Sequence, residues 1–290
     1  MTATTLQPII PRTDTPALLA ALQKSGSWDE HISMAISNPN ASIVTTPTFK
    51  YDITVGAKAT RVLIFDHLGA EEDMERDLKA FLAGLEKGTK VALDESAAFP
   101  HARAEILERV GFTNRVFAHP NVARQLDLVD VDGTPVAPTS IPPPEGITIH
   151  EITSSTDPRF DARVAVERDI FGYGAGYFSH LPAALAEMMD KYGDYHLLAT
   201  TANQDGGEEA VGYMTLRVHR GVAYLQGAGT VETWRKRGLT KAMLARTVAK
   251  AVEWGFEVML TVAWDENAVR AWTAMGFREV GITRVWDLDV

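Results

Sequence analysis

The sequence predicts an α/β protein of the α+β type, with a mixed sheet, helices on both faces and two consecutive units. Three observations predict this fold class. A proline-rich segment at 133–146 divides the 290 residues almost in half. After it, apolar runs of strand length alternate with amphipathic stretches of helix length, and a fainter form of this order precedes it. We therefore predict a first domain at 1–132, a linker at 133–146 and a second domain at 147–290.

The dividing segment contains five prolines between Gly133 and Gly146. Proline fixes the backbone angle φ and has no N–H to donate, so neither a helix nor a central strand continues through such a segment. A stiff, extended linker is the expected structure.

The second domain begins with Ile147, Ile149 and Ile152, whose spacing favours a strand. Two helices are then expected on either side of a glycine-rich turn. Three strands follow, because the breaks between them, Asp205-Gly206-Gly207 and Arg220-Gly221, have the composition of turns. The predicted ranges are 161–170 and 182–192 for the helices, and 195–201, 210–218 and 222–231 for the strands.

The remaining elements of the second domain are two helices and two strands. A helix at 238–254 is closed by Gly255, since glycine is the usual residue just past a helix end. The apolar run at 258–263 predicts a buried strand. The last two elements are a helix at 267–275 and a strand at 278–290. The pattern thus predicts the order β-α-α-β-β-β-α-β-α-β.

The first domain contains an echo of this order. A helix is expected at 71–85, a short strand at 91–93 and a helix at 101–110, which Gly111-Phe112 follows. In the second domain, the strand at 258–263 and the helix at 267–275 are followed in the same way by Gly276-Phe277. A duplicated fold is our hypothesis, although chance can also produce a match of this strength.

Composition excludes several kinds of function. The chain has no cysteine, which rules out a disulfide framework, a thiolate nucleophile and cysteine zinc sites, and we expect no metal. A net charge of −10 disfavours nucleic acid as a partner, because phosphate binding relies on clustered Lys and Arg. No apolar run approaches the length of a membrane helix and no signal peptide is recognisable. We expect a cytoplasmic protein without a membrane partner, of open oligomeric state.

A basic turn at Arg235-Lys236-Arg237-Gly238-Leu239-Thr240 carries the clearest chemical signal. The start of a helix presents unpaired N–H groups and a positive dipole end, which suits a pyrophosphate. The alternative is an ordinary basic helix start. Basic residues at this end oppose the helix dipole, however, so a bound anion explains them better.

Two segments of the second domain resemble the GNAT acyltransferase superfamily. The stretch from Gly229 to Leu244 resembles its strand-turn-helix, in which the turn follows Arg/Gln-x-x-Gly-x-Gly/Ala; Arg235 and Gly238 fit, whereas Thr240 replaces the small final residue. The stretch 265–277 resembles the closing Asn-x-x-Ala-x-x-x-Tyr-x-x-x-Gly-Phe segment. The resemblance covers roughly 147–290. With its cryptic first half, the chain is also similar to the glycine N-acyltransferase group, which implies a degenerate GNAT-like first domain that binds no CoA.

The resemblance implies an acyl-CoA donor, acetyl-CoA or a related thioester, and a small-molecule amine as acceptor. The implied contacts to CoA fall into three groups. Backbone groups of Thr230 and Val231 would hold the pantetheine arm; Arg235, Lys236, Arg237, Gly238, Leu239 and Thr240 would hold the pyrophosphate; and Asn267 would meet the distal part of CoA, unless it simply caps a helix.

In this superfamily the amine attacks the thioester directly, so a base must take its proton. Glu232 is the nearest carboxylate to the end of the expected strand, with a solvated surface residue as the equal alternative. Tyr224 and His219 are lesser candidates, and Gln226 could orient a water. Trp272 replaces the tyrosine that commonly protonates the thiolate, and an indole N–H has no suitable acidity.

The glycine-rich loop at 171–182 corresponds to the segment that lines the acceptor pocket in this superfamily. Its aromatic residues and histidine suit a mobile lid over an aromatic or amphipathic substrate, and a plain flexible loop is the alternative. The implied substrate contacts are Tyr173, Tyr177, Phe178 and His180.

Two other functions stay open at this point. A GNAT-fold protein can bind a CoA thioester as a sensor or partner module without transferring the acyl group. It can also catalyse another reaction of secondary metabolism, such as decarboxylation or cyclisation.

Overall fold

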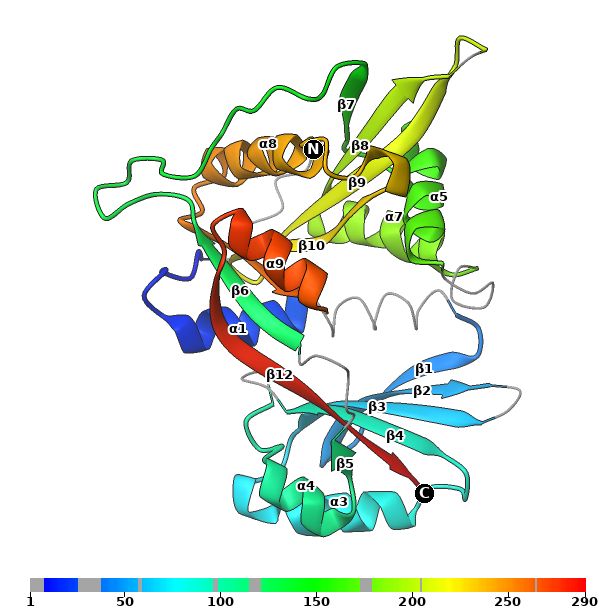
Figure 1. Cartoon of the computed structure of the whole chain (residues 1–290). Helices are drawn as coiled ribbons and strands as arrows, with labels where there is room; N and C mark the ends of the chain where they lie inside the picture. The colour runs from blue at the N-terminus through cyan, green and yellow to red at the C-terminus, as the bar shows by residue number, and fades with distance from the viewer. Residues whose placement is uncertain are drawn as a thin grey trace.

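The structure is a computed structural model of the whole chain (Figure 1). It describes residues 8–25, 38–56, 59–95, 99–114, 121–172, 179–203, 205–263 and 265–290. Twelve strands form one mixed sheet in the order β1-β2-β3-β4-β12-β6-β11-β10-β9-β8-β7, and β5 pairs with β12. The predicted α/β fold class is therefore confirmed.

The second half of the chain has the predicted order of elements, and every predicted boundary lies within two residues of the observed one. A short 3-10 helix, η3, is the only addition in the described part of this half. The elements are β7 (Ile147–Ile152), α5 (Phe160–Phe171), α7 (Leu181–Tyr192), β8 (Tyr195–Ala202), β9 (Glu208–His219), β10 (Val222–Thr230), η3 (Glu232–Trp234), α8 (Leu239–Glu253), β11 (Val258–Ala263), α9 (Glu266–Ala274) and β12 (Arg278–Asp289).

The first half contains more strands than its sequence pattern predicts. The expected helix at 71–85 is a 3-10 turn followed by a shorter α-helix, and the helix expected from 101 begins only at Ala104, because Arg103 before it is extended. The elements are α1 (Thr15–Gln23), β1 (Ala41–Thr45), β2 (Phe49–Val55), β3 (Thr60–His67), η2 (Glu71–Asp73), α3 (Met74–Ala83), β4 (Lys90–Glu95), α4 (Ala104–Val110), β5 (Thr113–Asn114) and β6 (Asn121–Asp127).

The two halves repeat one arrangement of strands. In the first half, β1, β2 and β3 are antiparallel neighbours, and β3 runs parallel to β4. In the second half, β8, β9 and β10 are antiparallel neighbours, and β10 runs parallel to β11. In both halves a helix connects the two parallel strands. The first half is thus a structural copy of the second, as the echo in the sequence suggested.

The halves exchange strands at their junction. β6 belongs to the first half of the sequence but lies between β11 and β12. Figure 1 shows β12 as a long strand that starts beside β6 and ends beside β4. Residues 278–283 of β12 pair with β6, and residues 284–289 pair with β4. Strand pairing therefore crosses the predicted boundary at Gly133 in both directions.

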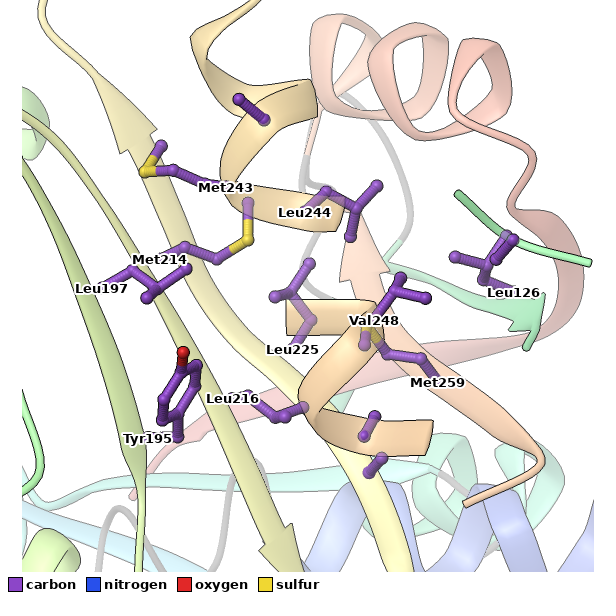
Figure 2. Packing of buried hydrophobic residues seen from close by; sticks show 14 of the residues in the cluster. Leu126, Tyr195, Leu197, Met214, Leu216, Leu225, Met243, Leu244, Val248 and Met259 are labelled. Carbon is purple, nitrogen blue, oxygen red and sulfur yellow. The ribbon is translucent and has the colours of Figure 1, made fainter. Parts of the chain in front are cut away.

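Helices cover both faces of the sheet in the second half. On one face, Met243, Leu244 and Val248 of α8 pack against strand residues such as Leu225 and Met259 (Figure 2). The other face carries α5 and α7 over β8 and β9, and α1 over β10 and β11. No helix among the described residues is long and apolar enough to cross a membrane.

The proline-rich segment at 133–146 contains no helix and no strand beyond one isolated bridge, between Val129 and Pro135. It is nevertheless attached to the domain, since Ala137 is buried in the core and Ile141 packs against it. These contacts fix the segment to the surface of the second half.

Candidate functional site

A V-shaped opening forms where β10 parts from β11. The two parallel strands pair only from Ala223 to Leu225 on the β10 side. At the last pair, the hydroxyl of Thr261 donates to the carbonyl of Leu225 at 3.0 Å. A bulge at Gln226 follows, and the rest of β10 continues along β9 alone. From Gln226 to Thr230, the edge of β10 that faces away from β9 therefore has no paired strand in the described chain.

The end of β10 is tied to the structure around it. Val231 N–H donates to the carbonyl of Val211 at 3.0 Å, and its own carbonyl accepts from Trp234 N–H at 2.9 Å. The N–H of Val231 is thus committed to β9, and only its carbonyl, which can accept a second hydrogen bond, is left for the pantetheine contact predicted there. Because the backbone groups of a strand alternate between its edges, the N–H of Thr230 points to the open edge. The carbonyl of Thr230 accepts from Nε of Arg235 at 3.1 Å.

The predicted phosphate turn adjoins this opening. Lys236 and Gly238 have φ values of +62° and +87°, and α8 begins at Leu239. A Cβ added to Gly238 would meet no heavy atom within 4 Å, so glycine is needed for its conformation and the space above it is open. The first N–H groups of α8 have no partner within the helix, and no side chain caps them.

Four exposed cations lie in the turn or directly after it: Arg235, Lys236, Arg237 and Lys241. The guanidinium of Arg237 lies 4.7 Å from the centre of the Trp234 ring, and Arg235 is held by Thr230. Each of the two arginines is thus held by a neighbouring group. Without a bound anion, the positive N-terminal end of α8 would repel their charge. The arrangement suits a phosphate group.

Two residues at the predicted turn also have structural roles. The side chain of Leu239 is buried in the core, so only its backbone faces the turn. The hydroxyl of Thr240 lies 3.2 Å from that of Thr230, and this contact links the start of α8 to the end of β10. Thr240, which departs from the small residue of the resemblance, thus braces the turn against the strand.

Asn267 lies exposed in the first turn of α9, and its side-chain oxygen accepts from Arg270 at 2.7 Å. The alternative that Asn267 caps the helix is wrong, because Asp265 is the cap and accepts from Ala268 N–H at 2.7 Å. Trp272 is buried and packs edge-on against Phe277, with ring centres 5.2 Å apart. Its position serves packing of the core.

The structure does not bring the two predicted catalytic residues together. Glu232 is exposed in η3, just after β10. Tyr224 is buried among apolar residues beneath α1. The bulge at Gln226 changes the alternation of β10, so that Tyr224 faces α1 whereas Ala228 faces the core under α8. His219 pairs with Val222, at the opposite end of β10 from the opening.

Of the predicted substrate contacts, Tyr173, Tyr177 and Phe178 lie outside the described residues. His180 is half-buried and directly precedes α7.

A buried polar cluster under α5 was not predicted from the sequence. Arg163 is fully buried, and it donates to Glu167 at 2.6 Å and to the hydroxyl of Thr215 at 2.7 Å. Thr215 in turn lies 3.1 Å from Nδ1 of His196. One signal was present in the sequence, because Arg163 and Glu167 are four residues apart on the apolar stripe that contains Phe160.

The same face holds a second buried ion pair, in which Arg217 contacts both carboxylate oxygens of Asp194. Burial raises the pKa of Asp194, and Arg217 opposes that effect. Burial also lowers the pKa of His196 well below its usual value, and Arg163 and Arg217 add to this shift. His196 is therefore neutral at physiological pH.

Comparison with known proteins agrees with this geometry. The acetyltransferase (GNAT) family model matches residues 162–277. No curated protein matches the sequence. Among solved structures, a tandem GNAT protein from the clavulanic acid biosynthesis pathway is similar with a TM-score of 0.58 and 14% identity, over 94% of this chain and 93% of that chain.

Two further structures show the same likeness of fold. A GCN5-related N-acetyltransferase from Sphaerobacter thermophilus has a TM-score of 0.57 and 18% identity, over 97% of this chain and 94% of that chain. Another from Kribbella flavida has a TM-score of 0.53 and 17% identity, over 89% and 95%. Residues 162–277 therefore form a domain of the GNAT acetyltransferase family, within a chain that has the fold of a tandem GNAT protein.

Proposed function

We propose that this chain is an acyl-CoA-dependent N-acyltransferase that uses acetyl-CoA or a related thioester and acts on a small-molecule amine. One observation carries the proposal: the opening between β10 and β11 adjoins a turn with uncommitted N–H groups and four exposed cations. An elongated ligand with an anionic end and an amide-containing arm matches both features.

In this proposal, each part of the cofactor meets a different group of the chain. The pantetheine arm lies along the open edge of β10, where the N–H of Thr230 is available. The pyrophosphate lies at the start of α8, near Gly238. Asn267, exposed on α9, is the proposed contact for the distal part of CoA.

The proposed chemistry is direct attack of the amine on the thioester carbonyl. The chain has to remove a proton from the amine and to stabilise the oxyanion that forms. Trp272 cannot protonate the thiolate, because an indole N–H is not acidic and the ring is packed in the core. Glu232, which is exposed near the end of β10, is one candidate base.

Thermal unfolding in the presence of CoA and acetyl-CoA tests cofactor binding. A ligand that binds only the folded state raises the melting temperature as its concentration increases. Consumption of the thioester with a panel of small amines then tests transfer. If millimolar acetyl-CoA leaves the melting temperature unchanged, the chain does not bind this cofactor and the proposal fails.

The buried position of Trp272 favours a second candidate, a CoA-thioester-binding protein that does not transfer the acyl group. Such a protein would be stabilised by acetyl-CoA but would leave the thioester intact with every amine. The two candidates thus predict the same thermal shift and opposite results in the turnover assay.

A further inference from the structure

The side of β10 that faces α5 has almost no side chain over the opening. Gly227 and Gly229 lie opposite Thr215 and Tyr213 of β9. A Cβ at Gly229 would come within 2.9 Å of Ile170 on α5, and one at Gly227 within 3.1 Å of the Tyr213 hydroxyl. The helix therefore packs directly on the glycine-rich part of the strand.

Glu167 lies on this side of α5. It follows Arg163 by one helical turn and precedes Ile170 by three residues, so the three side chains share one stripe of α5. Arg163 reaches Thr215 and lies 4.0 Å above the Tyr213 ring, whereas Ile170 reaches Gly229. Glu167 lies between these two residues along α5, on the side of the helix that faces β9 and β10.

The cluster around Glu167 differs from a purely structural ion pair. Nε of Arg163 and Nε2 of His196 are buried and have no hydrogen-bond partner among the described residues. The guanidinium of Arg217, by contrast, bonds Asp194, the carbonyl of Ser25 and the sulfur of Met188. Buried polar groups are nearly always bonded to protein or water, so these two unmet groups mark a place that can bind a water or another polar molecule.

We propose that Glu167 binds the acceptor amine and takes its proton, an inference that rests on the proposed acyltransferase function. The carboxylate would pair with the ammonium form and accept one proton from it. The free amine nitrogen then bonds to the thioester carbon while the carbon–sulfur bond breaks. The second proton leaves the nitrogen and ends on the thiol of CoA, and Glu167 releases its own proton to water.

The surroundings of Glu167 determine how its role would respond to pH. Arg163 contacts it from the same helix, and β9 contributes Tyr213 and Arg217 to this face. From the β8 side come His196, which is neutral, and Asp194, which is paired with Arg217. Glu167 is thus a buried carboxylate on the helix that packs against Gly229 through Ile170.

The test compares Glu167→Gln with the wild type in amine acylation and in acetyl-CoA binding. Glutamine preserves the volume and can still accept from Arg163, but it cannot take a proton. We expect kcat/KM for the amine to fall about 100-fold or more, as for loss of a general base. The acid limb of the pH profile should disappear, and stabilisation by acetyl-CoA should persist.

The matched control is Glu187→Gln, which removes a carboxylate paired with Lys191 four residues away on the surface of α7. It should behave like the wild type. Turnover by Glu167→Gln within threefold of the wild type would overturn the assignment, as would loss of the acid limb in Glu232→Gln alone. If Glu167→Gln does not fold, Glu167→Asp is the variant that tests the role of Glu167. It keeps the charge but withdraws the carboxylate along the shorter side chain. Turnover by Glu167→Asp at the wild-type rate would overturn the assignment.

The outcomes separate this inference from the proposed function. If the wild type acylates no amine, the proposed function fails and the role of Glu167 fails with it. If the wild type is active and Glu167→Gln is equally active, only the role of Glu167 fails.

Discussion

The two halves of this protein open their sheets at the same place, yet among the described residues a basic turn follows that place in the second half and not in the first. Parallel pairing ends at Ile64 in the first half and at Leu225 in the second. In each case the next residue, Phe65 or Gln226, is the extra residue of a bulge. The geometry that parts the strands is therefore present twice.

The halves diverge a few residues later. The 3-10 helix begins seven residues after the last parallel pair in both, at Glu71 and at Glu232. In the first half, α3 follows η2 without a gap, whereas four residues, 235–238, separate η3 from α8. These four residues belong to the basic turn and include its two positive φ angles. The second half, which is predicted to bind CoA, thus differs from the first half at this position by one short segment, 235–238.

The first half has a cluster of polar side chains at the end of β3. Nε2 of His67 lies 2.9 Å from Asp77, and Nδ1 of His67 lies 3.1 Å from His101. A Cβ at Gly69 would come within 2.8 Å of both His67 and Asp77. Acidic residues, Glu71, Glu72 and Asp73, form η2 and lie directly before α3, without an intervening basic turn. The two halves thus keep the same strand arrangement and differ in the few residues beside the place where the strands part.

The largest expected effect tests whether the first half depends on the last strand. Trp286 of β12 is buried in the core of the first half and donates to Glu95 at 3.0 Å. Trp286→Ala should lower the free energy of unfolding by about 3–5 kcal/mol, as for other large core truncations. Urea denaturation measures the change. Ile282→Ala, at an exposed site of the same strand, should cost less than about 0.5 kcal/mol; equal losses would contradict the exchanged-strand core.

A charge reversal makes the second half resemble the first. Arg235→Glu combined with Arg237→Glu should weaken acetyl-CoA binding about 100-fold, because two charge-assisted contacts become repulsive. Titration calorimetry at low and high salt measures the effect, which should shrink as salt screens the charges. Lys87→Glu with Lys90→Glu changes the net charge equally at exposed sites of the first half. The same loss of affinity in this control would mean that the net charge of the protein alone determines acetyl-CoA binding.

A smaller effect is expected at the glycine of the turn. Gly238→Ala forces a side chain into a backbone region with φ of +87°, which costs about 1 kcal/mol. We expect Gly238→Ala to lower the free energy of unfolding by this amount and to weaken the binding of acetyl-CoA about tenfold. Thermal unfolding with and without ligand measures both. Gly84→Ala is the control, because Gly84 has φ of −88° and should tolerate alanine; unaltered binding in Gly238→Ala would exclude the turn as the phosphate site.

The smallest expected effect is a pH dependence confined to the first half. The hydrogen bond from His67, followed by those from Arg76, lowers the pKa of Asp77 below its usual 3.8. The folded state therefore gains stability above that value, and loses it as the pH falls through the lowered pKa. Asp77→Asn should remove this part of the acid destabilisation in denaturation curves taken below about pH 5. The exposed Asp289→Asn should not; identical acid profiles for Asp77→Asn and the wild type would contradict the prediction.

Sequence pattern predicted the second half well because its signals are local. Turn residues such as Gly206-Gly207 separate strands of clear apolar composition, and Gly255 and Gly276 end helices. The basic turn was also predictable, because cations clustered around Gly238 at the start of a helix oppose its dipole unless an anion binds there. Element order and the position of the basic turn therefore followed from residues close together in the chain.

What the sequence could not predict depends on distant contacts. β6 has no apolar alternation, because it carries Arg124 and Gln125, which are buried by partners from the second half. Arg124, for example, donates to the hydroxyl of Thr273 at 2.8 Å. The bulge at Gln226, which turns Tyr224 away from the opening, also has no signature in composition. The charged pair inside the apolar stripe of α5, Arg163 and Glu167, was visible in the sequence, but the partner of Arg163 on β9, Thr215, was not.

The exchange of strands has a consequence for how the molecule is made. Residues 90–95 of β4 need residues 284–289 as their neighbours, and these are synthesised only after the whole second half. Contacts between residues this far apart in the chain slow folding and leave strand edges exposed meanwhile. The first half can therefore complete its sheet only after the second half has been synthesised, so a ribosome-bound intermediate should present the edge of β4 to chaperones.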